Sequence, residues 1–285
     1  MVHAVLLYAR ERSPLLLTAL LSLLLFAAGL HDFAVEPLLF FRGWLSMCLL
    51  LFLLRVSDDI CDIPLDRLAH PERALCSGRA PLNRINAFRA LAVLCLLGLQ
   101  IGHPAALLLV TLTLVFFSLF FRFKPDLHPL LHTALLDGAL GLFPLYAGLL
   151  LYGEIGTAQL LMGAFIWLGA LAHDYAHSVP DRRDSAVQRL NAITRVEPAL
   201  LACLSLLLFV LSAGVGLRLA CSNGLPWGFL GGLLLMTPLI LRLEYRLLRR
   251  PCAETAKPFY ITGFLFFLVP ILGHLGDLAW GYARA

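Results

Sequence analysis

Long apolar segments constrain the fold of this chain more than any other feature. They are each close to the roughly 20 residues that a helix needs to cross a bilayer, and they follow one another from residue 14 to residue 280. Hydrophobic residues make up 60% of the chain and charged residues only 14%, whereas a soluble domain is nearer a quarter charged. The segments are too long and too continuous for the alternating strands of a membrane barrel. We therefore predict an all-α, polytopic membrane protein.

Nine segments are predicted to span the membrane. Arginine and lysine concentrate before the first segment and in the connections after the second, fourth, sixth and eighth, and such basic segments stay on the cytoplasmic side. The N-terminus and these connections are therefore predicted to be cytoplasmic. The predicted spans are residues 14–30, 38–56, 84–101, 104–121, 129–151, 159–176, 198–217, 227–247 and 258–280.

Two polar clusters interrupt this apolar pattern. The first follows the second span, with Asp59, Asp62 and Asp66 at offsets of zero, three and seven, and the second follows the sixth span, where Asp174, His177 and Asp181 repeat these offsets. On a helix this spacing places the three side chains of a cluster on one face. The second and sixth spans are both even-numbered, so both end on the same side of the membrane as the N-terminus. Both clusters are therefore predicted to lie at the cytoplasmic side.

These features together indicate a ligand with a charged head and an apolar tail. Carboxylates gathered at the end of a membrane span need a counter-charge, and Mg²⁺ is usually held by one or two carboxylates together with substrate phosphates. Arginines in the adjacent connections match phosphate oxygens, and the apolar interior suits a long hydrocarbon. The pattern predicts an isoprenoid diphosphate that loses its diphosphate and leaves an allylic cation for an acceptor, with water excluded.

The same residues resemble a known family. Residues 58–66 are similar to the NDxxDxxxD motif of the UbiA-type intramembrane prenyltransferases, and residues 70–79 are similar to the basic stretch that follows it. The second cluster resembles the family's second Asp-rich motif, and residues 117–124 and 141–148 resemble its fourth and fifth helices. The resemblance implies one domain over residues 1–285. It also implies nine transmembrane helices around a central cavity, with a cytoplasmic cap formed by the 2–3 and 6–7 loops.

The resemblance also implies roles for individual residues. Asp59, Asp62, Asp174 and Asp181 are expected to be catalytic. Side chains expected to bind Mg²⁺ are Asp59, Asp62, Asp66, Asp174, Asp181 and Asp184. Side chains expected to bind the diphosphate are Asp58, Arg73, Arg122, Lys124 and Arg182. The implied partners are an isoprenoid diphosphate, an acceptor such as an aromatic compound, and the lipid bilayer, with no nucleic acid.

The chain departs from the family pattern at three positions that bear on function. Asp58 replaces the leading Asn, His70 replaces a Lys, and His177 stands where many relatives carry an acid. The His70 and His177 departures support one alternative function, a non-catalytic prenyl-lipid binding protein. A second alternative is a terpene cyclase of the same superfamily, because the short connections leave little room for a polar acceptor pocket. An intramembrane acid, Asp137, is predicted either to act on an acceptor or to form a structural pair with a group such as Arg89.

For the first cluster, the alternative to a ligand site is a solvated loop. In that interpretation the acids pair with Arg55, Arg67 and Arg73 and hold no ligand. For the second cluster the corresponding alternative is an ordinary charged loop, and His177 is predicted either to ligate a metal or to hydrogen bond to a ligand.

Overall fold

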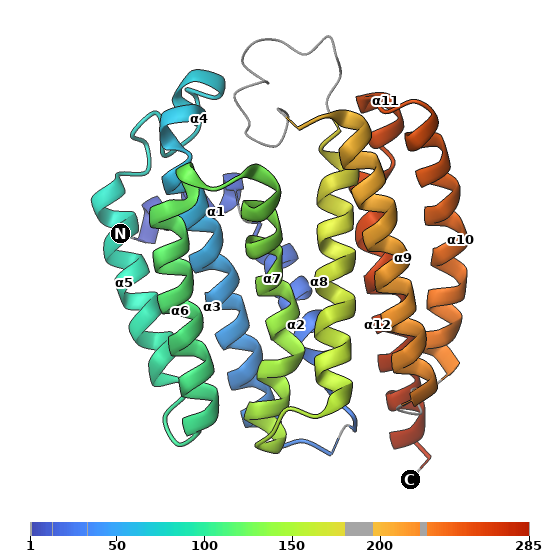
Figure 1. Ribbon diagram of the computed structural model, residues 1–285. Coiled ribbons are helices and arrows are strands. Elements are labelled where there is room, and N and C mark those ends of the chain that lie inside the picture. Colours follow the sequence, from blue (N-terminus) through green and yellow to red (C-terminus); the bar gives the residue numbers. More distant parts are fainter. Residues whose placement is uncertain (1, 13, 33, 180–195, 223–226, 285) are drawn as a thin grey trace. The chain divides into compact units, whose positions relative to one another are not determined.

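The structure, a computed structural model, describes residues 2–12, 14–32, 34–179, 196–222 and 227–284. All regular structure in these ranges is helical, which confirms the predicted all-α class (Figure 1). By their internal contacts the residues form two compact units. Unit 1 comprises Met1–Phe26, Glu36–Leu127 and Leu149–Gly153, and unit 2 comprises Ala27–Val35, His128–Gly148 and Glu154–Ala285. The single domain over residues 1–285 stays a prediction.

Unit 1 is organised around its longest helix, α3, which contacts α4, α5 and α6. The short N-terminal helix α1 packs against α5, and Tyr8 of α1 meets Phe52 of α3 edge to face, with ring centroids 6.0 Å apart. These rings form a small apolar core with Val56 and Ile85. The helices of unit 1 are α1 (Val2–Arg12), α2 (Leu15–Ala27), α3 (Pro37–Cys61), α4 (Ile63–Ala69), α5 (Leu82–Gly98), α6 (Pro104–Phe123) and the 3₁₀ turn η1 (Lys124–Asp126).

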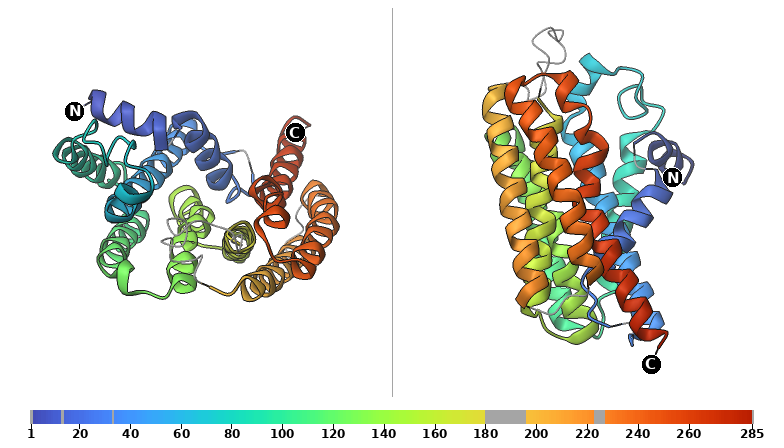
Figure 2. Two further views of the ribbon diagram at one scale, coloured as in Figure 1. Left: turned by 90° about the horizontal axis from the view of Figure 1, so that it is seen from above. Right: turned by 90° about the vertical axis from the view of Figure 1, so that its right-hand side faces the viewer.

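Unit 2 is organised around α8, which contacts α7, α9 and α12, while α10 packs against α9 and α12. In the right-hand view of Figure 2 the long helices α9, α10 and α12 are seen side by side. The segment before α3 joins this unit, because His274 donates to the carbonyl of Leu30 at 2.9 Å. The helices of unit 2 are α7 (Pro129–Ala147), α8 (Thr157–His177), α9 (Pro198–Ser222), α10 (Trp227–Arg249), α11 (Ala253–Ala256) and α12 (Phe259–Tyr282). The π-helix η2 (Gly148–Tyr152) continues α7, and all of it except Gly148 belongs to unit 1.

Paired glycines allow the helices of unit 2 to approach closely. A Cβ at Gly141 of α7 would lie 2.8 Å from the carbonyl oxygen of Gly163 on α8. On α12, a Cβ at Gly273 would collide with the backbone of Gly228 on α10. Small residues at such crossings let helices pack in a membrane, where van der Waals contact replaces the hydrophobic effect.

We expect Gly273→Ala to destabilise the packing of α10 against α12. The added methyl group meets the rigid backbone of Gly228, and overpacking of this kind costs about 1–3 kcal/mol. Gly276→Ala is the matched control, since a Cβ there meets nothing within 4 Å. Thermal unfolding of both variants in detergent measures the difference. Equal unfolding temperatures for the two variants would show that the crossing tolerates a side chain.

Among the described residues, six helical segments are long and apolar enough to cross a membrane, which supports a multi-pass membrane protein. They are Pro37–Cys61, Pro104–Asp126, Pro129–Tyr152, Pro198–Ser222, Trp227–Arg249 and Ala253–Tyr282. The other three predicted spans correspond to α2, α5 and α8. The first two have 13 and 17 residues, shorter than the roughly 20 that a bilayer requires, and α8 ends in a polar turn. The count of nine spans therefore stays a prediction.

Candidate functional site

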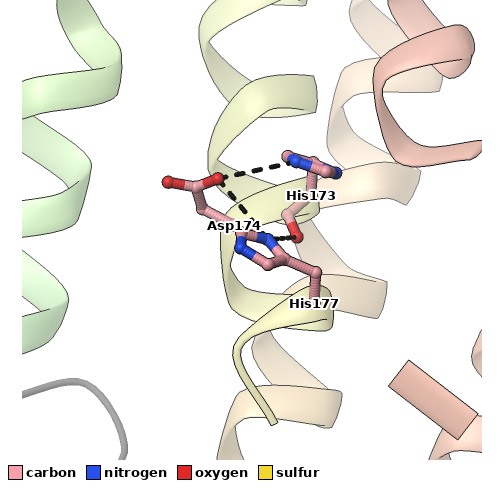
Figure 3. A group of neighbouring side chains, drawn as sticks. All are labelled: His173, Asp174 and His177. Carbon is pink, nitrogen blue, oxygen red and sulfur yellow. Dashed lines mark hydrogen bonds and ion pairs between the residues drawn. The ribbon is translucent and has the colours of Figure 1, made fainter. Parts of the chain in front are cut away.

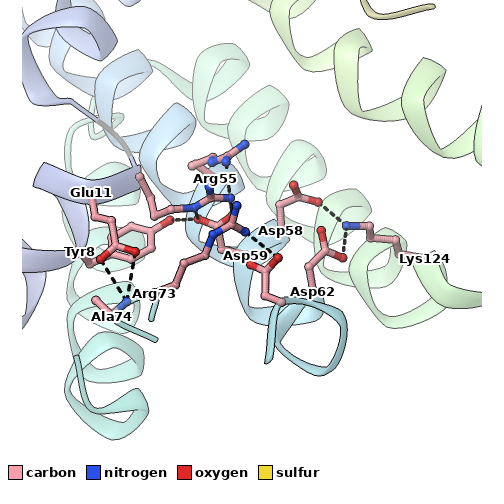
Figure 4. A network of polar contacts seen from close by, with 11 residues as sticks. Tyr8, Glu11, Arg55, Asp58, Asp59, Asp62, Arg73, Ala74 and Lys124 are labelled. Atoms are coloured by element: carbon pink, nitrogen blue, oxygen red, sulfur yellow. Dashed lines mark hydrogen bonds and ion pairs between the residues drawn. The ribbon is translucent and has the colours of Figure 1, made fainter. Parts of the chain in front are cut away.

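The first acidic cluster, Asp58, Asp59, Asp62 and Asp66, lies where α3 gives way to α4. Helix α3 ends at Cys61, and Pro64 stands at the start of α4, where its missing N–H is tolerated. Asp62 is both the C-cap of α3 and the N-cap of α4. The predicted single helical face is therefore interrupted at Asp62. Asp58 and Asp62 share one partner, while Asp59 and Asp66 have others, and Figure 4 shows Asp58, Asp59 and Asp62.

Asp59 is the buried member of the cluster, with 3% of its surface exposed. The Tyr8 hydroxyl donates to one carboxylate oxygen at 2.6 Å, and Arg12 donates to both oxygens at 2.7 and 3.2 Å. Arg55 adds a contact of 3.4 Å. Burial and the adjacent Asp59 charge raise the pKa of the Tyr8 hydroxyl, so it stays a donor. Asp59 thus ties α1 to α3.

Asp58 and Asp62 share one cation from the chain itself. The Lys124 ammonium donates to Asp58 at 2.5 Å and to Asp62 at 2.7 Å, and its side chain is only 10% exposed. Burial, and then the neighbouring Asp58 charge, raise the pKa of the Asp62 carboxyl above its ordinary range. Two carboxylates therefore converge on one position that a positive charge already occupies (Figure 4).

Asp66 pairs with Arg73 at 2.5 Å, and both side chains are mostly buried. Glu11 of α1 accepts from the backbone N–H of Ala74 with both oxygens, at 3.0 and 3.1 Å. The alternative of a loop in which Arg55 and Arg73 pair with the acids is thus correct for these two pairs. The acids of these pairs are largely shielded, since the Asp59 side chain is 4% and the Asp66 side chain 17% exposed, whereas the Arg55 side chain is 42% exposed.

The remaining predicted residues of the first site differ in placement. Arg122 is exposed at the end of α6, with its guanidinium 6.0 Å from the ring centroid of Phe123. His70 is about half exposed, with a ring nitrogen 3.5 Å from Glu72. In the second cluster Asp181, Arg182 and Asp184 lie outside the described residues.

Of the second cluster, the structure describes His173, Asp174 and His177, which lie at the C-terminal end of α8 (Figure 3). An Asp174 oxygen lies 3.7 Å from Nε2 of His173 and 3.6 Å from Nδ1 of His177. The two imidazole rings stack with centroids 4.6 Å apart. In the described part of the chain, these three residues form the group whose ligand atoms lie close enough together to hold a metal ion.

Asp137 of α7 joins this cluster from the neighbouring helix. Its side chain is buried and hydrogen bonds to Asp174. The other predicted partner, Arg89, instead donates to Ser57 at 2.9 Å and to Asn86 at 3.0 Å. Two carboxylates in contact repel each other unless a proton or a cation lies between them. Asp137 therefore belongs to a polar site rather than to a structural salt bridge with arginine.

An apolar cavity of about 390 Å³ lies in unit 1 beneath α1. Its walls come from α1, α2, α3 and α5, and they include Phe52 and Phe88. Because nearly all of the lining is hydrocarbon, an alkyl or prenyl chain is the chemistry that this cavity matches.

Sequence reasoning missed the contribution of α1 to the first cluster. Tyr8, Glu11 and Arg12 all reach residues more than 45 positions away, which local patterns do not report. The available signal was the alternation of charge at Arg10, Glu11 and Arg12 directly before an apolar segment. His173 was also missed as a candidate ligand, although it stands four residues before His177, one helical turn away.

Comparison with known proteins supports this architecture. The sequence profile described as the UbiA prenyltransferase family matches residues 15–269. The solved structure of a digeranylgeranylglyceryl phosphate synthase in membranes superimposes with a TM-score of 0.71, covering 96% of this chain and 99% of that one. The identity is 17%, so this likeness establishes the fold. No curated protein matches the chain.

Proposed function

Because this chain belongs to the UbiA prenyltransferase family, we propose that it is a Mg²⁺-dependent intramembrane prenyltransferase. The C–O bond between an isoprenoid and its diphosphate breaks, and the bonding electrons leave with the diphosphate. A nucleophilic atom of the acceptor bonds to the resulting allylic cation and loses its proton. Aromatic compounds are the first acceptor class to test.

The observation that carries this proposal is the arrangement of Asp58, Asp62 and Lys124. Carboxylate oxygens are the ligands that Mg²⁺ prefers, and one or two of them suffice when phosphate supplies the others. The shared ammonium of Lys124 marks a position where these two acids favour a cation. Mg²⁺ bound by these acids would neutralise charge on the departing diphosphate. Lys124, displaced from the acids, would pair with diphosphate oxygens.

Asp59 has a different role in this proposal from that of Asp58 and Asp62. Its oxygens already accept hydrogen bonds from Tyr8 and Arg12, so it positions α1 and the start of the cluster. Asp66 orients Arg73, whose remaining donors are proposed to bind the diphosphate. Arg122 and Arg182 are proposed to add charge near the head group, and Asp174, Asp181 and Asp184 are proposed as carboxylates of the second motif.

The membrane orientation follows from the distribution of basic residues. Most of the 22 lysines and arginines lie before the first apolar segment or in the connections that are predicted to be cytoplasmic. We place the N-terminus and both clusters at the cytoplasmic face, where a prenyl diphosphate presents its charged head group.

The test is release of diphosphate by the purified protein in nanodiscs, with a panel of prenyl diphosphates and aromatic acceptors. We expect release that requires a divalent cation, stops with EDTA and resumes with Mg²⁺. Product analysis identifies a prenylated acceptor. A cyclised hydrocarbon formed without acceptor would instead support a cyclase, and prenyl diphosphate recovered unchanged from the whole panel would support a binding protein.

A further inference from the structure

The last turn of α8 holds two histidines and an aspartate in an arrangement typical of a metal site. His173 and His177 are four residues apart, so their rings lie on one face of the helix, as in helical motifs that bind zinc through two histidines. Asp174 lies between them and approaches a nitrogen of each ring within 3.7 Å. We propose that His173, Asp174 and His177, together with Asp137, bind a divalent transition-metal ion such as Zn²⁺.

The hydrogen bonds of His173 leave the correct nitrogen for a metal. Its Nδ1 lies 2.9 Å from the carbonyl oxygen of Phe259. A carbonyl only accepts, so Nδ1 carries the hydrogen and Nε2, on the side of Asp174, keeps its lone pair. A backbone carbonyl that holds the second nitrogen is the usual outer partner of a metal-binding histidine.

His177 is held in a similar way by the helix backbone. Its Nδ1 lies 3.0 Å from the carbonyl oxygen of His173, so Nδ1 is the donor and Nε2 is the nitrogen that is left for a metal. Imidazole nitrogen favours Zn²⁺ and related transition metals, whereas Mg²⁺ favours oxygen. The nature of these two side chains therefore points away from Mg²⁺.

Asp137 adds a second carboxylate to this group, and one of its oxygens has no hydrogen-bond partner that the structure describes. Its carboxyl contacts Asp174, and its Oδ2 atom is buried without a hydrogen-bond partner among the described residues. The residue is 9% exposed. A proton shared by the two carboxyls would leave when an ion binds, and the charge of minus two on the two carboxylates is what one divalent cation cancels. The cation would also remove the repulsion between the two acids.

Packing from α12 fixes the histidine pair in place. The ring of Phe264 lies 4.2 Å from that of His173 between centroids. A Cβ at Gly263 would come within 3.0 Å of the His173 side chain, so a glycine is required there. His173 is 2% exposed, while Asp174 and His177 remain about one-third exposed and give an ion access.

This inference rests on unit 2 alone and holds whether or not the chain transfers a prenyl group. The experiment therefore uses the full chain without any prenyl diphosphate, purified in detergent through an affinity tag that contains no histidine. The protein is stripped with EDTA and titrated with Co²⁺ or Zn²⁺ in a large excess of Mg²⁺. Mass spectrometry of bound metal gives the stoichiometry, and the visible absorption of Co²⁺ reports nitrogen ligands.

We expect one Co²⁺ per chain that Mg²⁺ does not displace. His177→Gln and Asp137→Asn should each weaken Co²⁺ binding by about tenfold or more, as loss of a metal-site residue does. His103→Gln, at the start of α6, is the matched control and should bind Co²⁺ like the wild type. Gel filtration and thermal unfolding check that each variant is folded. Because His177 is partly exposed, its variant carries the test if Asp137→Asn fails to fold.

Two results would overturn the inference: wild-type protein that retains no more Co²⁺ than His177→Gln does, or bound Co²⁺ that Mg²⁺ replaces at equal concentration. Neither result touches the proposed prenyl transfer, because diphosphate release with Mg²⁺ is measured separately. Conversely, stoichiometric Co²⁺ binding by a protein that never releases diphosphate would leave the metal site in place.

Discussion

Asp62→Asn is expected to reduce Mg²⁺-dependent diphosphate release by about two orders of magnitude, the loss caused by removing one group that stabilises developing charge. Asparagine keeps the shape of the side chain and can still accept a hydrogen bond from Lys124, but it has no negative charge for a cation. The loss should appear in kcat/KM, together with a higher Mg²⁺ concentration for half-maximal release. A colorimetric assay of released diphosphate measures both.

Asp126→Asn is the matched control for this substitution. Asp126 is an exposed acid in η1, two residues after Lys124. Its substitution removes the same charge, but Asp126 does not belong to the first acidic cluster. We expect it to keep wild-type activity. Normal diphosphate release by Asp62→Asn, or an equal loss of release in both variants, would show that Asp62 does not take part in cleaving the prenyl diphosphate.

Apolar segments predicted the helices of this chain closely. The predicted span 104–121 corresponds to α6, Pro104–Phe123, and the span 227–247 corresponds to α10, Trp227–Arg249. In both cases a long apolar stretch defines the helix. The helix begins at the Pro or Trp residue with which that stretch begins. The 13 residues of α2 were harder to interpret, because the apolar segment continues beyond the point where that helix ends.

The candidate site was predictable in its composition but not in its pairings. The spacing of Asp58, Asp59 and Asp62 located the cluster, yet periodicity does not tell which acid is buried. Asp59 is buried because Tyr8 and Arg12, about 50 residues earlier, cover it. Lys124 reaches Asp58 across 66 positions. Choices between such partners depend on packing of helices distant in sequence, which a local pattern does not contain.

The same limit applied to the second cluster. Asp137 was recognised as a functional candidate because an acid inside a membrane segment is costly. Its partner Asp174 was assigned separately to a motif on another helix, and only the packing of α7 against α8 brings the two together. Without that contact, the charge balance that favours a cation could not be worked out.

Arg12→Ala is expected to destabilise the protein by about 2 kcal/mol. Removing one partner of a buried ion pair costs roughly 3–5 kcal/mol, but Arg12 is 21% exposed and Tyr8 and Arg55 still contact Asp59, which lowers the cost. Because α1 is held to α3 through this carboxylate, the N-terminal helix should also detach more readily. Thermal unfolding in detergent and limited proteolysis near residue 12 measure the two effects.

Arg10→Ala provides the control, since Arg10 has the same charge on the same helix but an exposed side chain. A double-mutant cycle with Asp59→Asn then isolates the pair: if the two residues act on each other, the effect of Arg12→Ala becomes much smaller once Asp59 is uncharged. Additive effects, or a loss in Arg10→Ala as large as that in Arg12→Ala, would mean that α1 is held by its apolar contacts with Phe52 and not by the buried carboxylate.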